Sequence, residues 1–121
     1  MKICISSEGK SLESRVASQF GRCAYFVIVD TDTKSVESIP NPGAKAPGGA
    51  GVQAAETVAS TKAKVLLTGR IGPSAFPILS EAGIELRIGI EGTVSDALKQ
   101  YETGSLELLE TPNSSAHSPE K

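Results

Sequence analysis

The segment "NPGAKAPGGAGVQAAE" (residues 41–56) combines a glycine-rich loop with the start of a helix. Its glycines include Gly48, Gly49 and Gly51, and an alanine-rich, helix-forming run follows. Backbone N–H groups at a helix start are unpaired, and glycine lets them close around an anion. The pattern therefore predicts an anion-binding loop. A flexible connection whose glycines permit tight turns is the alternative interpretation.

A second loop, "TGRIGP" (68–73), contains Gly69, Arg70 and Gly72 and follows an apolar run that reads as a strand. Pro73 suits the first position of the next helix. In open α/β sheets, ligands bind beside the carboxyl ends of the strands. Two helix N-termini together with the Arg70 guanidinium would favour an anion at that edge.

A third loop, "FGRCAYF" (20–26), places Gly21, Arg22 and Cys23 directly before a strand. An adjacent arginine would stabilise the thiolate of Cys23, and the thiolate is the form that binds soft metals. Cysteine is also a common small core residue, so packing is the competing interpretation. Cys4 lies within a predicted strand, and we expect it in the core.

Nucleotide binding by the glycine-rich loop (43–51) is the alternative function. Gly43 to Gly48 fit the first part of a P-loop, but Gly49 and Ala50 stand where lysine and a hydroxyl residue are required. "GAGVQA" (49–54) fits a dinucleotide fingerprint, and Arg70 is placed for a 2′-phosphate. The fingerprint should follow a strand directly, whereas a proline-containing segment intervenes. A nucleotide-binding enzyme or sensor is therefore the second hypothesis.

The chain has 121 residues, 39% of them hydrophobic and 21% charged, with a formal net charge of -2. This length suits one domain, and the charge argues against a general nucleic-acid binder. No apolar run reaches the ~20 residues of a membrane span, and the N-terminus does not resemble a secretion signal. Two cysteines without a C-x-x-C pair do not predict a disulfide framework, so we expect a cytoplasmic protein.

Hydrophobic periodicity predicts a single α/β domain over residues 1–110, with a mixed β-sheet flanked by helices. The predicted strands are 2–6, 24–30, 35–40, 64–68, 84–88 and an edge strand at 106–109, and the predicted helices are 52–62, 73–82 and 93 to about 101. The first strands form an antiparallel hairpin region, and the later alternation implies parallel strands. Residues 111–121 are polar and contain two prolines, which predicts a disordered C-terminal tail.

Together, "FGRCAYFVIVD", "PGGAGVQAAE" and "VLLTGRIGPSA" resemble the dinitrogenase iron–molybdenum cofactor biosynthesis family, over residues 1 to about 110. That family includes the NifX and NifY carriers, the C-terminal region of NifB and the small orange protein type. The resemblance implies a ribonuclease-H-like motif. It also implies a non-catalytic protein that binds or carries a metal–sulfur cluster, of the iron–molybdenum cofactor precursor or molybdenum/copper sulfide type, with cofactor-assembly proteins as partners.

In this reading, N–H groups of Gly21, the 48–51 loop, Gly69 and Gly72 hold the anionic cluster, Arg22 and Arg70 add charge-assisted hydrogen bonds, and Cys23 adds one metal–sulfur bond. Many relatives have histidine where this chain has Gln19, so a direct histidine–metal bond is not predicted. The only histidine, His117, lies in the predicted tail. The first strand carries no acidic residue, so nuclease chemistry is not expected.

Overall fold

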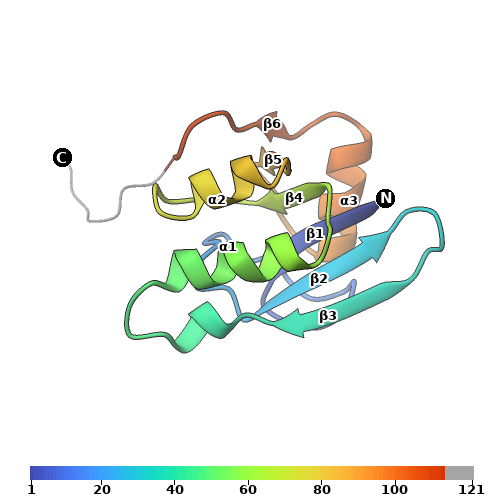
Figure 1. Ribbon diagram of the computed structural model, residues 1–121. Helices are drawn as coiled ribbons and strands as arrows, with labels where there is room; N and C mark the ends of the chain where they lie inside the picture. The colour runs from blue at the N-terminus through green and yellow to red at the C-terminus, as the bar shows by residue number, and fades with distance from the viewer. Residues whose placement is uncertain (114–121) are drawn as a thin grey trace.

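Strand β1 (Lys2–Ser7) lies between an antiparallel neighbour and a parallel one, and this defines a mixed sheet. In the computed structural model, which describes residues 1–113, six strands lie in the order β3-β2-β1-β4-β5-β6 (Figure 1). The other strands are β2 (Tyr25–Asp30), β3 (Val36–Pro40), β4 (Val65–Thr68), β5 (Glu85–Ile88) and β6 (Glu107–Leu108). The helices are the 3-10 helix η1 (Pro42–Lys45), α1 (Ala50–Ser60), α2 (Phe76–Glu81) and α3 (Val94–Glu102).

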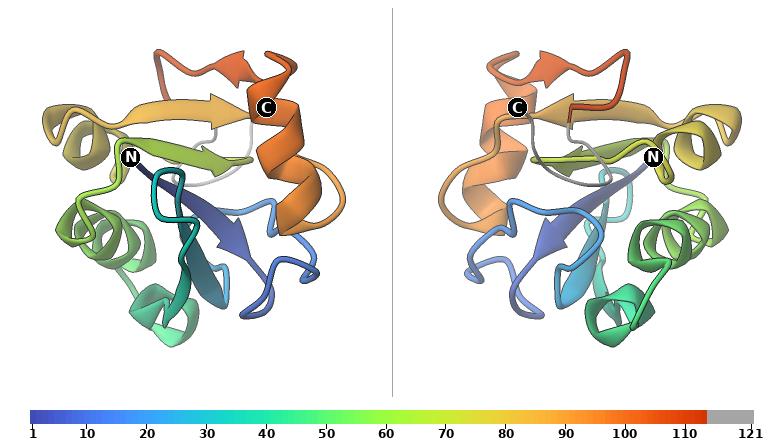
Figure 2. Two further views of the ribbon diagram at one scale, coloured as in Figure 1. Left: turned by 90° about the vertical axis from the view of Figure 1, so that its right-hand side faces the viewer. Right: turned by 90° about the vertical axis from the view of Figure 1, so that its left-hand side faces the viewer.

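Helices cover both faces of the sheet (Figure 2). On one face, Ala54 and Val58 of α1 and Leu79 of α2 pack with Cys4 of β1. On the other, the buried residues of α3 pack with Ile5 and its neighbours. Successive side chains of a strand point to opposite faces, so the apolar run of β1 supplies both layers of core.

The strands and helices predicted from the sequence are all present, with shifted ends. The predicted helix 52–62 begins two residues earlier, at Ala50. The predicted helix 73–82 was too long, because residues 73–75 form a turn and α2 begins at Phe76. Pro77 explains this start, since proline has no N–H and fits only the first turn of a helix. The 3-10 helix η1 was not predicted.

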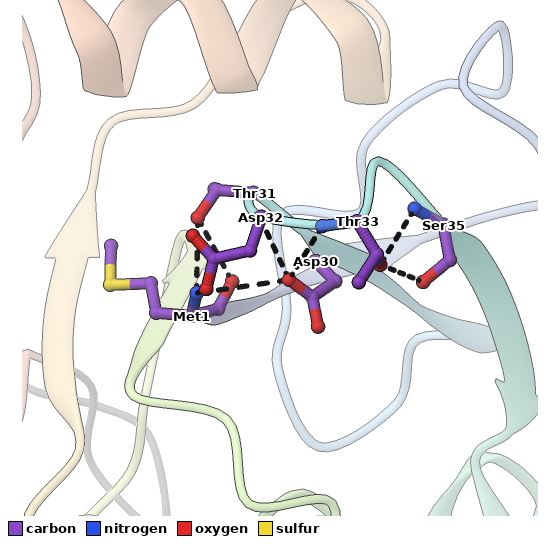
Figure 3. Close-up of polar contacts among 6 residues, drawn as sticks. All are labelled: Met1, Asp30, Thr31, Asp32, Thr33 and Ser35. Atoms are coloured by element: carbon purple, nitrogen blue, oxygen red, sulfur yellow. Dashed lines mark hydrogen bonds and ion pairs between the residues drawn. The ribbon is translucent and has the colours of Figure 1, made fainter.

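Strands β2 and β3 are joined by a turn that also fixes the start of β1 (Figure 3). Asp30 Oδ1 accepts hydrogen bonds from the N–H groups of Asp32 (2.8 Å) and Thr33 (3.3 Å), which lower the pKa of the Asp30 carboxyl. The Met1 ammonium donates to Asp32 Oδ2 (2.8 Å) and Thr31 Oγ1 (3.1 Å), and the hydrogen bond with Asp32 raises its pKa. This polar cluster closes the end of the sheet where β1 begins.

The sequence "TVSD" (93–96) matches the spacing of a helix capping box, with Asp in place of the usual Glu or Gln, and the start of α3 confirms this prediction. Thr93 Oγ1 accepts from the Asp96 N–H at 3.1 Å, and Asp96 Oδ2 accepts from the Thr93 N–H at 3.0 Å. The hydrogen bond from the Thr93 N–H, together with the Thr93 hydroxyl, lowers the pKa of the Asp96 carboxyl from 3.8. The ionised form is therefore the one that the folded state prefers.

We expect the contribution of Asp96 to stability to depend on pH in a defined direction. Its pKa is lower in the folded than in the unfolded state, so the stabilisation is complete above the unfolded value near 3.8 and is lost as the pH falls through the folded value. Urea unfolding of Asp96→Asn should show a stability deficit at neutral pH that shrinks in acid. Glu102→Gln is the matched control, because that carboxylate accepts no hydrogen bond from residues 1–113. A deficit that is unchanged in acid would contradict the assignment.

Candidate functional site

A cavity of about 810 Å³ lies where the carboxyl end of β4 meets the start of α1. Three separate chain segments line it, with residues 19–22, residues 49–52, and Arg70 with residues 72–75, together with Asn113. In Figure 1 the arrowhead of β4 and the first turns of α1 and α2 lie on the same side of the molecule. This is the edge of the sheet where α/β proteins bind ligands.

The cavity gathers six of the nine site residues predicted from the sequence. Those that line it are Gly21, Arg22, Gly49, Gly51, Arg70 and Gly72. Gly48, Gly69 and Cys23 do not line it. The three predicted loops therefore do converge on one site.

The start of α1 presents unpaired donors to this cavity. Gly49 precedes the helix in the left-handed conformation (φ 70°), and no side chain caps the helix. The first bond of the helix runs from the Gln53 N–H to the Gly49 carbonyl at 3.0 Å. The N–H groups of Ala50, Gly51 and Val52 make no hydrogen bond with residues 1–113, so they remain available to an anion.

Two arginines supply the formal charge of the cavity. The Arg70 side chain is exposed and makes no hydrogen bond or ion pair with residues 1–113. Arg22 donates from Nη1 to the Ala46 carbonyl at 2.7 Å and to the Gly43 carbonyl at 3.3 Å, so part of its guanidinium fastens the glycine loop. The described lining contains no acidic side chain, and its electrostatic potential is therefore positive.

Asn41, which the sequence analysis did not single out, joins two of the loops. It is only 4% exposed, and its Nδ2 donates to the carbonyls of Cys23 (2.8 Å) and Gly21 (3.1 Å). Its Oδ1 accepts from the Gly43 N–H at 2.9 Å. The Asn-Pro pair in the sequence is a recognised turn signal and could have indicated this position.

Several of the glycines are required by close packing of the backbone. A Cβ atom on Gly43 would collide with the carbonyl oxygens of Ala50 and Gly21, and one on Gly69 would collide with the carbonyl of Ser18. A Cβ on Gly21 would lie only 3.3 Å from the backbone of Gly51. The glycine content of these loops thus reflects tight approach as well as donor geometry.

Cys23 lies in the loop at residues 20–26 and is 3% exposed. It borders a second, smaller cavity of about 310 Å³ that Arg22 also lines. Burial raises the pKa of the Cys23 thiol to about 12, although the Ser7 N–H and the Asn41 amide act to lower it. The thiol therefore keeps its proton at neutral pH, and its predicted role as a metal ligand stays a prediction. Cys4 is fully buried in the core, as expected.

Within residues 1–113, no group of three or more His, Cys, Asp or Glu side chains is placed to hold a metal ion. This part of the chain therefore provides no set of side chains that would coordinate a single metal ion. The same residues contain no helix long and apolar enough to cross a bilayer. His117 and most of the predicted tail lie outside the described residues.

The fold and the sequence together define a small α/β domain of a known class. The sequence model of the dinitrogenase iron-molybdenum cofactor family matches residues 1–104. The chain belongs to this family, which confirms the resemblance seen in its three loops.

Two solved structures and one relative that is similar in sequence agree with this assignment. The apo form of the orange protein from Desulfovibrio gigas is 38% identical, with a TM-score of 0.87 over 93% of this chain and 95% of that one. A protein of Thermotoga presumed to be a NifB protein is 34% identical, with a TM-score of 0.82 over 93% of this chain and 96% of that one. An uncharacterized protein of Methanocaldococcus jannaschii is 27% identical over 100 residues, which are 80% of this chain and 85% of that protein. The single domain and its mixed sheet are thus confirmed, while the ribonuclease-H-like description stays a prediction.

Gly43→Ala is expected to lower the free energy of unfolding by about 1–3 kcal/mol, because its Cβ would overlap two carbonyl oxygens. Gly48→Ala is the matched control in the same loop, since no atom lies within 4 Å of its Cβ position. We expect the control to stay within about 0.5 kcal/mol of the parent. Chemical denaturation of both variants measures the difference, and equal stability of the two would contradict the packing shown for Gly43.

Proposed function

We propose that this chain binds a preassembled anionic metal–sulfur cluster in the 810 Å³ cavity and carries it without catalysing a reaction. Membership of the family implies involvement in the biosynthesis or binding of the iron–molybdenum cofactor. The observation that carries the finer proposal is the convergence of Arg22, Arg70 and the uncapped start of α1 on one cavity whose described lining has no acidic side chain. The cargo is an iron–molybdenum cofactor precursor or a molybdenum/copper sulfide.

The chemistry of the lining suits this class of cargo. Sulfide-rich clusters are anionic and accept hydrogen bonds at sulfur, and backbone N–H groups and guanidiniums are donors for such acceptors. Val52 and Pro73 add apolar contact area beside these donors. Binding distributed over several weak contacts permits release, which a carrier needs and a permanent cofactor site does not.

Cofactor-assembly proteins are the proposed partners, because a carrier must receive its cargo and pass it on. The proposal places this activity in the cytoplasm, where the two unpaired cysteines Cys4 and Cys23 stay reduced. Nucleotide binding at the 43–51 loop gains no support from the topology. The loop follows edge strand β3, whose one neighbour within residues 1–113 is the antiparallel strand β2, whereas the dinucleotide motif joins two adjacent parallel strands.

Titration with tetrathiomolybdate, alone and with copper(I), tests the proposal through visible absorbance and metal analysis. We expect saturable binding, and Arg70→Ala should weaken it about tenfold, as expected for the loss of one charge-assisted hydrogen bond. Arg22→Ala should weaken it as well and also lower the melting temperature, because the carbonyls of Gly43 and Ala46 lose their donor.

Arg87→Ala is the matched control for that experiment. It removes the same charge, but Arg87 pairs with Glu85 (2.7 Å) and does not line the cavity. Affinity equal to that of the parent is expected. A parent protein that binds neither probe, and whose melting temperature rises instead with a nucleotide, would contradict the carrier proposal and favour the nucleotide hypothesis.

Cys23→Ala is expected to leave tetrathiomolybdate affinity within about twofold of the parent, because the thiol is buried, protonated and outside the cavity lining. The binding titration and a thermal melt should be measured on the same sample, since loss of a buried side chain lowers stability. Loss of binding in a variant that remains folded would instead assign Cys23 as a metal ligand.

A further inference from the structure

Asn113 lies 42 residues along the chain from Ile71, which is in the turn that follows β4. Its side chain nevertheless forms hydrogen bonds with the residues on either side of Arg70 in that turn. Its Nδ2 donates to the Gly69 carbonyl at 3.1 Å, and its Oδ1 accepts from the Ile71 N–H at 2.8 Å. Its own N–H donates to the Ile71 carbonyl at 3.1 Å. One residue near the end of the described chain thus spans the peptide groups before and after Arg70.

Residues 18–20 hold the opposite side of the same turn. The Arg70 N–H donates to the Ser18 carbonyl at 2.7 Å, and the Arg70 carbonyl accepts from the Phe20 N–H at 3.0 Å. The backbone of Arg70 is therefore fixed from two directions, with the side chain of Ile71 fully buried beneath it. Among the polar groups of Arg70, the guanidinium alone has no hydrogen-bond partner in residues 1–113. It lines the same cavity as Asn113.

We propose that Asn113 is a positioning residue for Arg70. It fixes the turn so that the guanidinium meets an anionic metal sulfide without first having to order its own backbone. The inference rests on the proposed function and deepens it, because it makes the segment after β6 part of the cluster site. Asparagine suits the task, since one short side chain carries both the donor for Gly69 and the acceptor for Ile71. A preordered binding group loses less conformational entropy when its ligand arrives.

The test is a double-mutant cycle on the full chain, with tetrathiomolybdate as the probe. Asn113→Ala is expected to weaken binding about fivefold in the parent background, because the turn that positions Arg70 loses both side-chain hydrogen bonds of Asn113. In the Arg70→Ala background the same change should cost less than about twofold, because its effect passes through Arg70. Thr111→Ala is the matched control in the same segment, since its side chain makes no hydrogen bond within residues 1–113.

A residue that merely stabilises the fold would lower the melting temperature and leave the cycle additive. Equal losses in both backgrounds, or unchanged affinity of Asn113→Ala, would overturn the inference while the proposed function stands. A parent protein that does not bind the probe would overturn both. Should Asn113→Ala fold poorly, Asn113→Ser provides the cycle, and faster hydrogen exchange at the Ile71 amide is the expected sign that the turn has lost its acceptor.

Discussion

Close approach of backbone segments is the constraint on which the cavity depends. A Cβ atom at Gly43 or Gly69 would collide with another peptide group, and one at Gly21 would make a tight contact with Gly51, so the loops pack this closely because these positions are glycine. The loops belong to different parts of the chain, and the sheet order brings them to one edge. Asn41 and Arg22 then satisfy the carbonyl groups that such tight packing would otherwise leave unpaired.

This arrangement divides the polar groups of the loops into two sets. Asn41 and one nitrogen of Arg22 are engaged in holding the loops together. The N–H groups at the start of α1 and the guanidinium of Arg70 are left without partners in the described part of the chain. In such a site the loops are held in place, while the donors that line the cavity have no partner among the described residues. This is the state expected of a preorganised binding site, which gains hydrogen bonds only when an anion enters.

Much of the fold could be predicted from the sequence because the local signals agree with the tertiary structure. The apolar runs became strands, Thr93 and Asp96 formed their capping box, and the loops before the helices met at one edge. The errors arose where a long-range contact or an overlooked proline decided the outcome. Pro77 shortened α2, and the contacts of Asn113 cannot be read from a polar segment whose composition resembles a disordered tail. Adjacent residues also differ in their surroundings. The thiol of Cys23 is buried, whereas the side chain of Arg22 beside it extends to the glycine loop and hydrogen-bonds to it.

The burial of both cysteines has a consequence for the metal–sulfur cluster that we propose as the cargo. Copper and molybdenum ions in a sulfide cluster readily exchange sulfide ligands for accessible thiolates. A cysteine on the surface of the protein would therefore compete with the sulfide ligands for the metals of the cluster. Cys4 and Cys23 are the only two cysteines of the chain, and both are shielded from water and hold their protons. Neither thiol is therefore available for ligand exchange with a bound cluster, which would not lose its metals to the cysteines of the protein.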